Sequence, residues 1–226
     1  MPDPVPKRHH GLVRLTHWLN AVFLTGMIAS GLQIYVAFQH FGSKNAALGV
    51  PNPFDSDTFG RMPEAVRLGG WLAGGLRWHF TLAWGFVITG VIYAGFLAVS
   101  GEWRKLIFRP RDVPGAWQMV RYYLRLRKDH PPQGKHNPLQ KSAYSFVIAL
   151  AVVSVLTGIA IAKPIQLGFL TSMFGGDELA RYWHFVAVWT FIAFTIMHVV
   201  MVFVADRASL RAILTGRYRG RFPDAP

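Results

Sequence analysis

Four of the nine histidines in this chain lie inside stretches of sequence that carry no charged residue. They are His17, His79, His184 and His198. An ionisable side chain is energetically costly in such an apolar stretch and therefore marks a candidate functional site, and neutral imidazole is the commonest metal ligand among side chains. A single buried histidine is as often hydrogen-bonded to a neighbouring helix, but four together favour metal binding.

The spacing of the last two histidines limits what they can bind. In a helix, 14 residues cover about 21 Å and end about 40° short of four turns, so His184 and His198 face one side near opposite ends. One metal ion cannot reach both imidazoles. By depth, His17 belongs with His198 (the inner pair) and His79 with His184 (the outer pair). Two haem b groups, each held by two imidazoles from facing helices, fit this arrangement.

The two inner histidines do not lie at matching distances from the ends of their charge-free stretches. His17 is the third residue of its charge-free stretch, whereas His198 lies eight residues before Asp206. If both helices ended at one depth, the two inner imidazoles would be displaced along the axis. We expect tilt or protrusion of the first helix to close the gap.

A flat macrocycle also needs space beside its ligands and cations for its propionate groups. Small residues in the first stretch would provide the space. These residues are Ala21, Thr25, Gly26, Ala29, Ser30 and Gly31. An arginine precedes three of the histidines by two or three residues, and we expect Arg14, Arg77 and Arg181 to bind propionates. The alternative for these arginines is ordinary snorkelling at helix ends.

The charge-free stretches are long enough to cross a bilayer, because about 20 apolar residues cover its hydrocarbon core. They run over 15–43, 78–101, 142–162 and 182–205. We predict an all-α membrane protein, a four-helix transmembrane bundle forming a single integral-membrane domain over 1–226. The predicted spans are about 15–38, 76–101, 139–162 and 182–205. Only 15% of residues are charged, which excludes a soluble enzyme and a nucleic-acid-binding domain.

The distribution of Lys and Arg predicts the orientation in the membrane. Of the 24, 18 lie in the N-terminus, the 102–141 segment and the C-terminal tail, and six lie in the two other loops. Positive charge collects on the cytoplasmic side, so we expect both termini there, in a bacterial inner membrane. This bias explains the net charge of +13 without a nucleic-acid partner. The absence of cysteine excludes disulfides, covalently attached haem and iron–sulfur ligation by this chain.

The 102–141 segment predicts two further features on the cytoplasmic side. Trp117, Val120 and Leu124 recur at helical spacing, with basic residues on another face (Arg121, Arg125 and Lys128), which predicts a short interfacial amphipathic helix. Asn137 followed by Pro138 predicts a capped start for the third span.

Several motifs resemble the bacterial di-haem cytochrome b561 family over nearly the whole chain. The family includes the membrane cytochrome b subunits of nickel–iron hydrogenases, respiratory formate dehydrogenase and thiosulfate-reductase-like complexes. The matching segments are Arg14-Leu-Thr-His17-Trp18, His79 at the head of its span, His184 with His198, and Gly134-Lys-His-Asn-Pro-Leu-Gln-Lys141. The resemblance implies the same inner and outer pairs as the depths do.

The resemblance also implies a quinone site. In the formate dehydrogenase subunit, the residue matching Asn137 lies at the quinone pocket beside the inner haem. Gln140 and Lys141 are further polar groups at this helix entry, and we expect them to bind a quinone carbonyl or deliver its proton. The alternative is that Asn137 only caps the helix and Lys141 only anchors it at the interface.

The outer segment 39–75 is long for a connection between adjacent helices, and we expect it to dock a periplasmic partner. Its Gly69–Gly75 stretch before Arg77-Trp-His79 resembles thiosulfate-reductase-type members, which accompany a periplasmic molybdenum oxidoreductase. We therefore expect a subunit that transfers electrons between such a partner, or a hydrogenase-type one, and the quinone pool. Two alternatives remain: a stand-alone cytochrome b561 that oxidises a small reductant such as superoxide, and a structural membrane anchor without haem.

Overall fold

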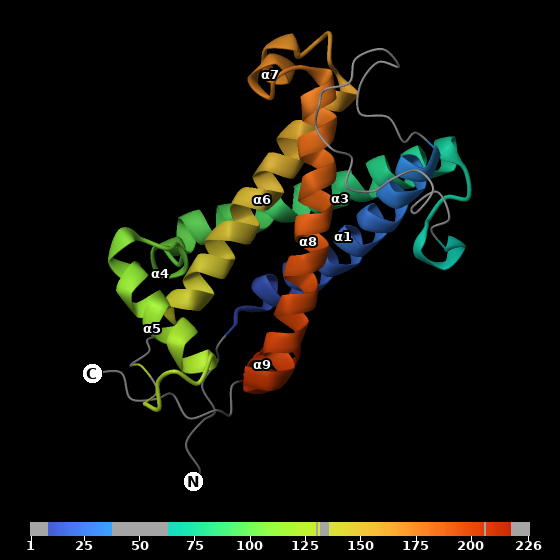
Figure 1. The fold of residues 1–226 in the computed structure, drawn as a ribbon. Coiled ribbons are helices and arrows are strands. Elements are labelled where there is room, and N and C mark those ends of the chain that lie inside the picture. Colours follow the sequence, from blue (N-terminus) through green and yellow to red (C-terminus); the bar gives the residue numbers. More distant parts are fainter. Residues whose placement is uncertain (1–8, 38–62, 130, 132–135, 206, 218–226) are drawn as a thin grey trace. The chain divides into compact units, whose positions relative to one another are not determined.

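The computed structural model describes residues 9–37, 63–129, 131, 136–205 and 207–217, and the regular elements in these ranges are helices (Figure 1). Four of them are long and apolar enough to cross a membrane. They are α1 (Gly11–Ala37), α3 (Leu72–Ser100), α6 (Pro138–Ala162) and α8 (Asp177–Ala205). The prediction of four long apolar helices is therefore confirmed.

Each long helix begins one to five residues before its predicted start. Three of them carry charged residues in their first turns, such as Arg14 in α1 and Asp177 in α8. A charge marks where a helix leaves the hydrocarbon, but backbone hydrogen bonding continues past it. Their outward side chains are strongly exposed, as Trp84 (68%) and Val204 (79%) show, which is what lipid-facing positions require.

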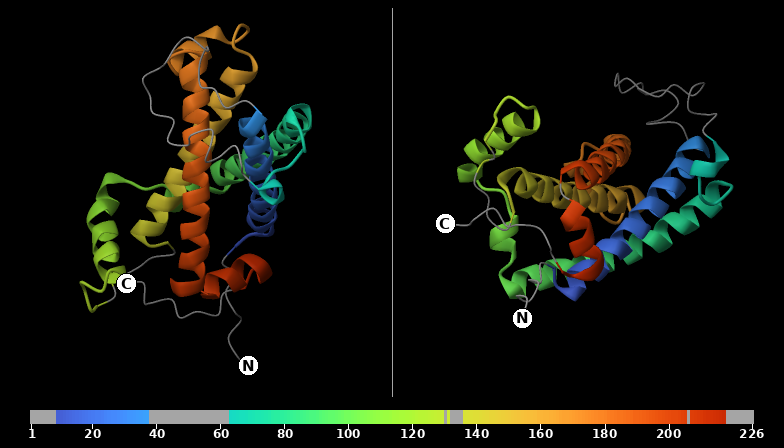
Figure 2. Two further views of the ribbon diagram at one scale, coloured as in Figure 1. Left: turned by 45° about the vertical axis from the view of Figure 1, so that its right-hand side comes forward. Right: turned by 90° about the horizontal axis from the view of Figure 1, so that it is seen from below.

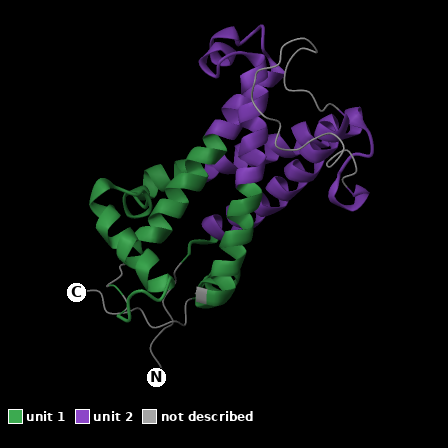
Figure 3. Cartoon of the chain, in the orientation of Figure 1, with its two compact units in different colours: residues 1–11, 94–152, 191–226 green, residues 12–93, 153–190 purple. Residues whose placement is uncertain are grey.

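The shorter elements connect or follow the long ones. They are η1 (Glu64–Val66), α4 (Trp103–Leu106), η2 (Pro110–Asp112), α5 (Val113–Tyr123), α7 (Gly168–Met173) and α9 (Arg207–Thr215). The chain forms two compact units, and α3, α6 and α8 contribute residues to both (Figure 3). Unit 2 comprises Leu12–Tyr93 and Val153–Thr190, and unit 1 comprises Met1–Gly11, Ala94–Val152 and Phe191–Pro226.

In unit 2, α1 and α3 run antiparallel and side by side (Figures 1 and 2). A Cβ at Gly26 would lie 2.5 Å from the Leu82 side chain, and one at Gly85 would lie 2.7 Å from the Phe23 ring. One turn further along, the Thr89 hydroxyl donates a hydrogen bond to the Asn20 side chain. Gly26, one of the small residues predicted to make space, therefore lies where α1 packs closely on α3.

The segment before α3 is fastened to α1 through its backbone. The Leu68 N–H donates to the Ala29 carbonyl oxygen at 3.1 Å. Gly69 has φ +118°, and a Cβ at Gly74 would lie 2.1 Å from the Gly69 carbonyl oxygen, so both positions require glycine. Gly75 lies directly against Gln33 of α1.

Also in unit 2, α7 closes the connection between α6 and α8. Ala160, Leu170 and Ala180 form a buried cluster, one from each helix. The Thr171 hydroxyl of α7 donates to the Ala160 carbonyl oxygen at 3.2 Å. This connection sets where α8 begins relative to α6.

In unit 1, the predicted amphipathic helix is present as α5 but is shorter than its pattern. Leu124 is its C-cap, and Arg125 has φ +59°, which ends the helix. The expectation that Arg125 and Lys128 lie on a face of this helix was therefore wrong. Met119 is fully buried and Trp117 is 63% exposed. The interfacial position of α5 stays a prediction, and α9, where a basic tail was expected, is an additional helix.

Candidate haem site

The outer pair of histidines meets in unit 2. The ring centroids of His79 and His184 are 6.1 Å apart, and the rings are inclined by 74°. An imidazole nitrogen lies about 1.1 Å from its ring centre and a metal–imidazole bond is about 2.0 Å, so two rings on one metal have centroids about 6.2 Å apart. Edge-to-face aromatic pairs, the class to which these rings belong, have centroids about 4.5–7 Å apart, so the distance also suits an ordinary ring contact. The separation is compatible with two imidazoles that would hold one metal.

The proton of His79 lies on Nδ1. This nitrogen is 3.1 Å from the Met27 carbonyl oxygen and 3.2 Å from the Ser30 Oγ. A carbonyl oxygen only accepts hydrogen bonds, so Nδ1 must carry the proton. The Ser30 hydroxyl donates to the Gly26 carbonyl oxygen at 2.8 Å and so also accepts from the ring. Nε2 consequently keeps the lone pair that a metal requires.

His184 is held in the same way by α6. Its Nδ1 lies 3.0 Å from the Thr157 Oγ1, and the same hydroxyl donates to the Val153 carbonyl oxygen at 2.8 Å. A threonine hydroxyl has one proton, so it accepts from the ring N–H. The Ser154 backbone is a further hydrogen-bond partner of His184. Both ligand nitrogens of the outer pair are thus fixed as Nε2.

A glycine follows each of these hydroxyl residues and lies against the same ring. A Cβ at Gly31 would be 3.5 Å from the His79 Cε1, and one at Gly158 would be 3.2 Å from the His184 Cε1. Ser30 and Thr157 are fully buried. From the sequence, Ser30 and Gly31 were predicted only to be small residues that make space. The recurring hydroxyl–glycine dipeptide in two apolar helices was the signal that could have identified both supports.

The inner pair lies in different units, so its pairing stays a prediction. His17 belongs to unit 2 and His198 to unit 1, where its ring stacks on Phe194 at 6.0 Å. Each inner histidine does lie at a similar distance from the end of its own helix. His17 lies six residues after the start of α1, and His198 lies seven residues before the end of α8.

The outer histidines have the same depth within their helices. His79 and His184 each lie seven residues after the first residue of α3 and α8. All four histidines therefore lie about two turns inside a helix end.

The three arginines expected to bind propionates differ in their surroundings. Arg181 donates from Nε to the Asp177 carboxylate at 2.8 Å, one turn earlier in α8. Arg77 is exposed, and Arg14 is partly buried in the first turn of α1. Their role in binding propionates stays a prediction.

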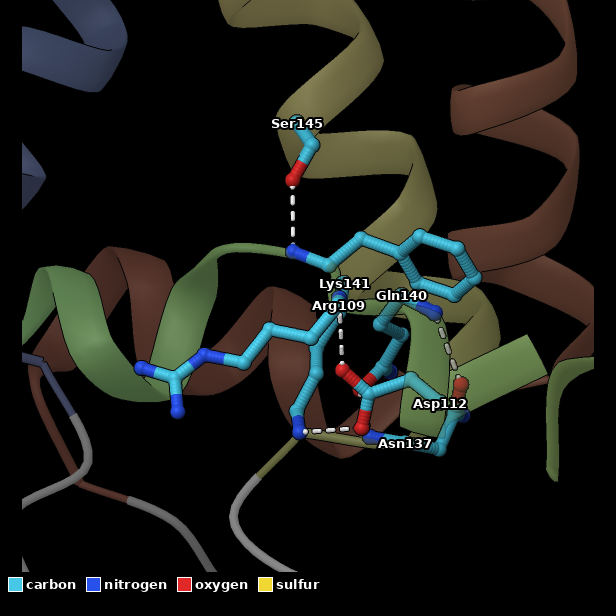
Figure 4. Close-up of polar contacts among 7 residues, drawn as sticks. Arg109, Asp112, Asn137, Gln140, Lys141 and Ser145 are labelled. Atoms are coloured by element: carbon cyan, nitrogen blue, oxygen red, sulfur yellow. Dashed lines mark hydrogen bonds and ion pairs between the residues drawn. The ribbon is translucent and has the colours of Figure 1, made fainter.

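The residues expected to bind quinone begin α6 in unit 1 (Figure 4). The Gln140 backbone N–H donates to the Asn137 Oδ1 at 2.7 Å, and the Asn137 N–H donates to the Gln140 Oε1 at 3.1 Å. This reciprocal pair is a capping box, with Pro138 at the first helical position. The predicted cap is confirmed, and it uses the side-chain oxygens of Asn137 and Gln140.

Lys141 binds Asp112, which lies at the start of α5. Lys141 Nζ donates to the Asp112 Oδ1 at 3.0 Å, and the Arg109 backbone N–H donates to the Oδ2 at 2.9 Å (Figure 4). Burial alone would raise the pKa of the Asp112 carboxyl. The hydrogen bond from Lys141, that from Arg109 and the charges of Lys141 and Arg111 more than compensate, so the pKa lies below its ordinary value. Asp112 is therefore ionised at neutral pH and fastens α5 to α6.

Comparison with known proteins assigns the chain to a family. The family model for prokaryotic cytochrome b561 matches residues 8–216. This chain belongs to the prokaryotic cytochrome b561 family. A relative from Azospira oryzae, named as a proposed protein-methionine-sulfoxide reductase subunit YedZ1, is 34% identical over 91% of this chain and 94% of its own length.

Two further relatives are named as B-type cytochrome subunits of Ni/Fe-hydrogenases. The protein from Cupriavidus necator is 26% identical over 92% of this chain and 84% of its own length. The protein from Azotobacter vinelandii is 26% identical over 95% of this chain and 88% of its own length. Membership implies haem b binding and electron transport in a bacterial membrane, as the motifs around the four histidines predicted.

The outer pair of this cytochrome fits haem better than it fits a bare metal ion. Among the described residues, no group of three or more His, Cys, Asp or Glu side chains could hold a metal ion. Two opposed imidazoles suit a metal whose remaining ligands come from a macrocycle. The glycines beside the rings let His79 and His184 lie close against α1 and α6.

The hydrogen bond from His184 to Thr157 gives a test of the outer pair. Thr157→Val removes the acceptor while leaving a side chain of similar shape. Loss of a hydrogen bond that supports a metal ligand weakens metal binding about 10–100-fold. The contact between His184 and the Ser154 backbone remains in this variant. We therefore expect haem release from the outer pair to accelerate about tenfold, at the lower end of that range. The measurement is haem transfer from the purified cytochrome to excess apomyoglobin.

Thr190→Val is the matched control, because the Thr190 hydroxyl donates to the Val186 carbonyl oxygen of its own helix at 2.8 Å. We expect wild-type haem release in this variant. Equal rates in the two variants would show that the Thr157 hydroxyl does not support the haem ligand.

Proposed function

We propose that this cytochrome b561-type subunit holds two haem b groups and transfers electrons between a periplasmic oxidoreductase and the quinone pool. The observation that carries the proposal is the outer pair, two imidazoles at ligand separation with both Nδ1 protons bound by α1 and α6. A purely structural anchor would not need two neighbouring histidines whose Nδ1 atoms both donate to the protein and leave both Nε2 lone pairs available. The inner pair, His17 and His198, would hold the second haem.

When bound, haem b supplies reversible one-electron transfer at its iron. The residues of this chain determine how that iron is held. Ser30 and the Met27 carbonyl oxygen fix the His79 ring, and Thr157 fixes the His184 ring. Ligands held in this way would need little reorganisation during electron transfer, and the solvent access and dielectric around the group would set its redox potential.

The start of α6 would bind the quinone next to the inner haem. The Asn137 and Gln140 oxygens are used in capping, so their amide N–H₂ groups are the donors available for a quinone carbonyl. Lys141 is paired with Asp112. It would therefore fasten α5 to the start of α6 and balance the charge of Asp112, rather than bind quinone directly. Protons for quinone would be exchanged with the cytoplasm, where both termini and α5 are placed by the charge distribution.

The partner is proposed from the relatives and from the outer segment. The Azospira relative is named as part of a methionine-sulfoxide reductase, and the resemblance of the Gly69–Gly75 stretch favours a molybdenum-dependent periplasmic enzyme. The hydrogenase cytochromes make a nickel–iron partner the second candidate. Residues 39–62 of the segment expected to dock this partner lie outside the described residues.

Haem content tests the central proposal. We expect the purified protein to contain two haems per chain by the pyridine haemochrome assay, and His184→Ala and His198→Ala each to contain one, because each removes one axial ligand. His10→Ala is the control, since His10 precedes α1 and stacks on Phe96. A wild-type protein without haem would instead support the structural anchor.

The quinone site is tested without disturbing the helix cap. Asn137→Asp keeps the oxygen that caps α6 and removes the amide donors, so we expect thermal stability to hold and reoxidation of the dithionite-reduced haems by a quinone analogue to slow about tenfold. That factor corresponds to about 1.4 kcal/mol, one hydrogen bond. Ser145→Ala, which removes only the acceptor for the Phe108 N–H, is the control. Wild-type reoxidation in Asn137→Asp would place quinone elsewhere.

The partner is tested by purifying the tagged protein from native membranes and measuring metals. We expect molybdenum to accompany the wild-type protein and to be lost when residues 45–58 are deleted, with both haems retained, because Gly69–Gly75 and its contacts with α1 are kept. Nickel in place of molybdenum would identify a hydrogenase-type partner. No accompanying metalloenzyme would favour a stand-alone cytochrome that oxidises a small reductant such as superoxide.

A further inference from the structure

Arg67 is a largely buried cation in unit 2, and the described residues give it only a distant, exposed carboxylate as an anion. Its side chain is only 17% exposed, and its Nε is buried with no hydrogen-bond partner among the described residues. One terminal nitrogen donates to the Gln33 Oε1 at 3.4 Å. The other lies 3.8 Å from the Glu64 carboxylate, whose side chain is 96% exposed.

These partners do not compensate for burial of the guanidinium. A pair at 3.8 Å with a fully solvated carboxylate contributes little, because water screens it. Gln33 is neutral, and the Nε–H has no hydrogen-bond partner in the part of the chain that the structure describes. Buried arginines in proteins are paired and hydrogen-bonded, so a buried N–H of this kind points to an anion that binds there.

The backbone around Arg67 holds it in place against α1. The Leu68 N–H is bonded to the Ala29 carbonyl oxygen, and the turn at Gly69 and Gly74 is too tight for any side chain. Arg67 therefore does not move freely to solvent as an arginine at a helix end would. The fold keeps a positive charge at this position at an energetic cost.

The position is close to the outer pair. Gln33, which contacts Arg67, lies three residues after Ser30, which contacts His79. Three residues correspond to about 4.5 Å along the axis and about 60° around it, so both contacts lie on neighbouring parts of one face of α1. Arg67 is thus about one helical turn beyond the His79 support, toward the end of α1 that leads into the outer segment.

We propose that Arg67, oriented by Gln33, binds a propionate carboxylate of the haem held by His79 and His184. This inference rests on the proposed function, since it requires haem at the outer pair. The fork of a guanidinium matches a carboxylate with two parallel N–H donors, and the Nε–H is one of them. Arg67 suits this role better than Arg181, which is paired with Asp177, or Arg77, which is exposed.

A redox titration of the purified protein, free of its partner, tests the inference. Loss of the positive charge in Arg67→Gln makes the outer haem harder to reduce. We expect the ratio of reduced to oxidised outer haem at a fixed ambient potential to fall about tenfold, which for one electron is about 59 mV. Arg67→Lys keeps the charge, and we expect its ratio to stay within about threefold of wild type.

Lys163→Gln is the control for loss of one positive charge, because Lys163 is an exposed residue at the end of α6. An outer-haem ratio in Arg67→Gln equal to that in Lys163→Gln would overturn the inference while leaving the two-haem proposal intact. A wild-type protein lacking the outer haem would overturn the proposed function itself.

Two further outcomes are decided by the lysine variant. If Arg67→Gln loses the outer haem, retention of that haem in Arg67→Lys supports carboxylate binding, and loss in both variants indicates a packing role and overturns it. A change in the ratio seen only when the periplasmic partner is attached would assign Arg67 to a partner carboxylate and also overturn the inference.

Discussion

The N–H of each buried imidazole must find an acceptor inside the protein, because lipid offers none. In the outer pair this requirement selects the supporting residues. His79 donates to the Met27 carbonyl oxygen and Ser30 of α1, and His184 donates to Thr157 of α6. The same hydrogen bonds determine which nitrogen is left for the metal. The hydrogen bond of the imidazole Nδ1–H therefore fixes the tautomer of each histidine, the orientation of its ring and the helix that lies beside it.

The supports also explain where the small residues lie. A hydroxyl can reach the ring only if its helix comes close, and Gly31 and Gly158 permit that approach directly beside the hydroxyl. In α1, Gly26 serves the same purpose toward α3 one turn earlier. Close packing and ligand support are thus two results of one arrangement of residues. A larger side chain at either glycine would separate the hydroxyl from the imidazole that it holds.

The sequence predicted the four long helices and the outer pair because apolar length and residue spacing depend on one helix at a time. It placed His17 too near a helix end, because charge marks the limit of the hydrocarbon and α1 continues past Arg14. It extended α5 through Arg125, where the backbone turns left-handed. Arg67 could not be predicted from the sequence. Its burial depends on the hydrogen bond between Leu68 and Ala29, and a contact between a loop and a helix leaves no periodic pattern in the sequence.

The start of α6 and the outer pair use polar groups in different ways. At the outer pair, each imidazole Nδ1–H has an acceptor that positions the ring. At α6, the oxygens of Asn137 and Gln140 satisfy the helix end, while Lys141 and Asp112 neutralise each other. Capping occupies the acceptors only, so it leaves the amide N–H₂ groups of Asn137 and Gln140 outside the cap. A capped helix entry and a site for a carbonyl-bearing molecule are therefore compatible in the same residues, and the cap keeps those donors in a fixed position.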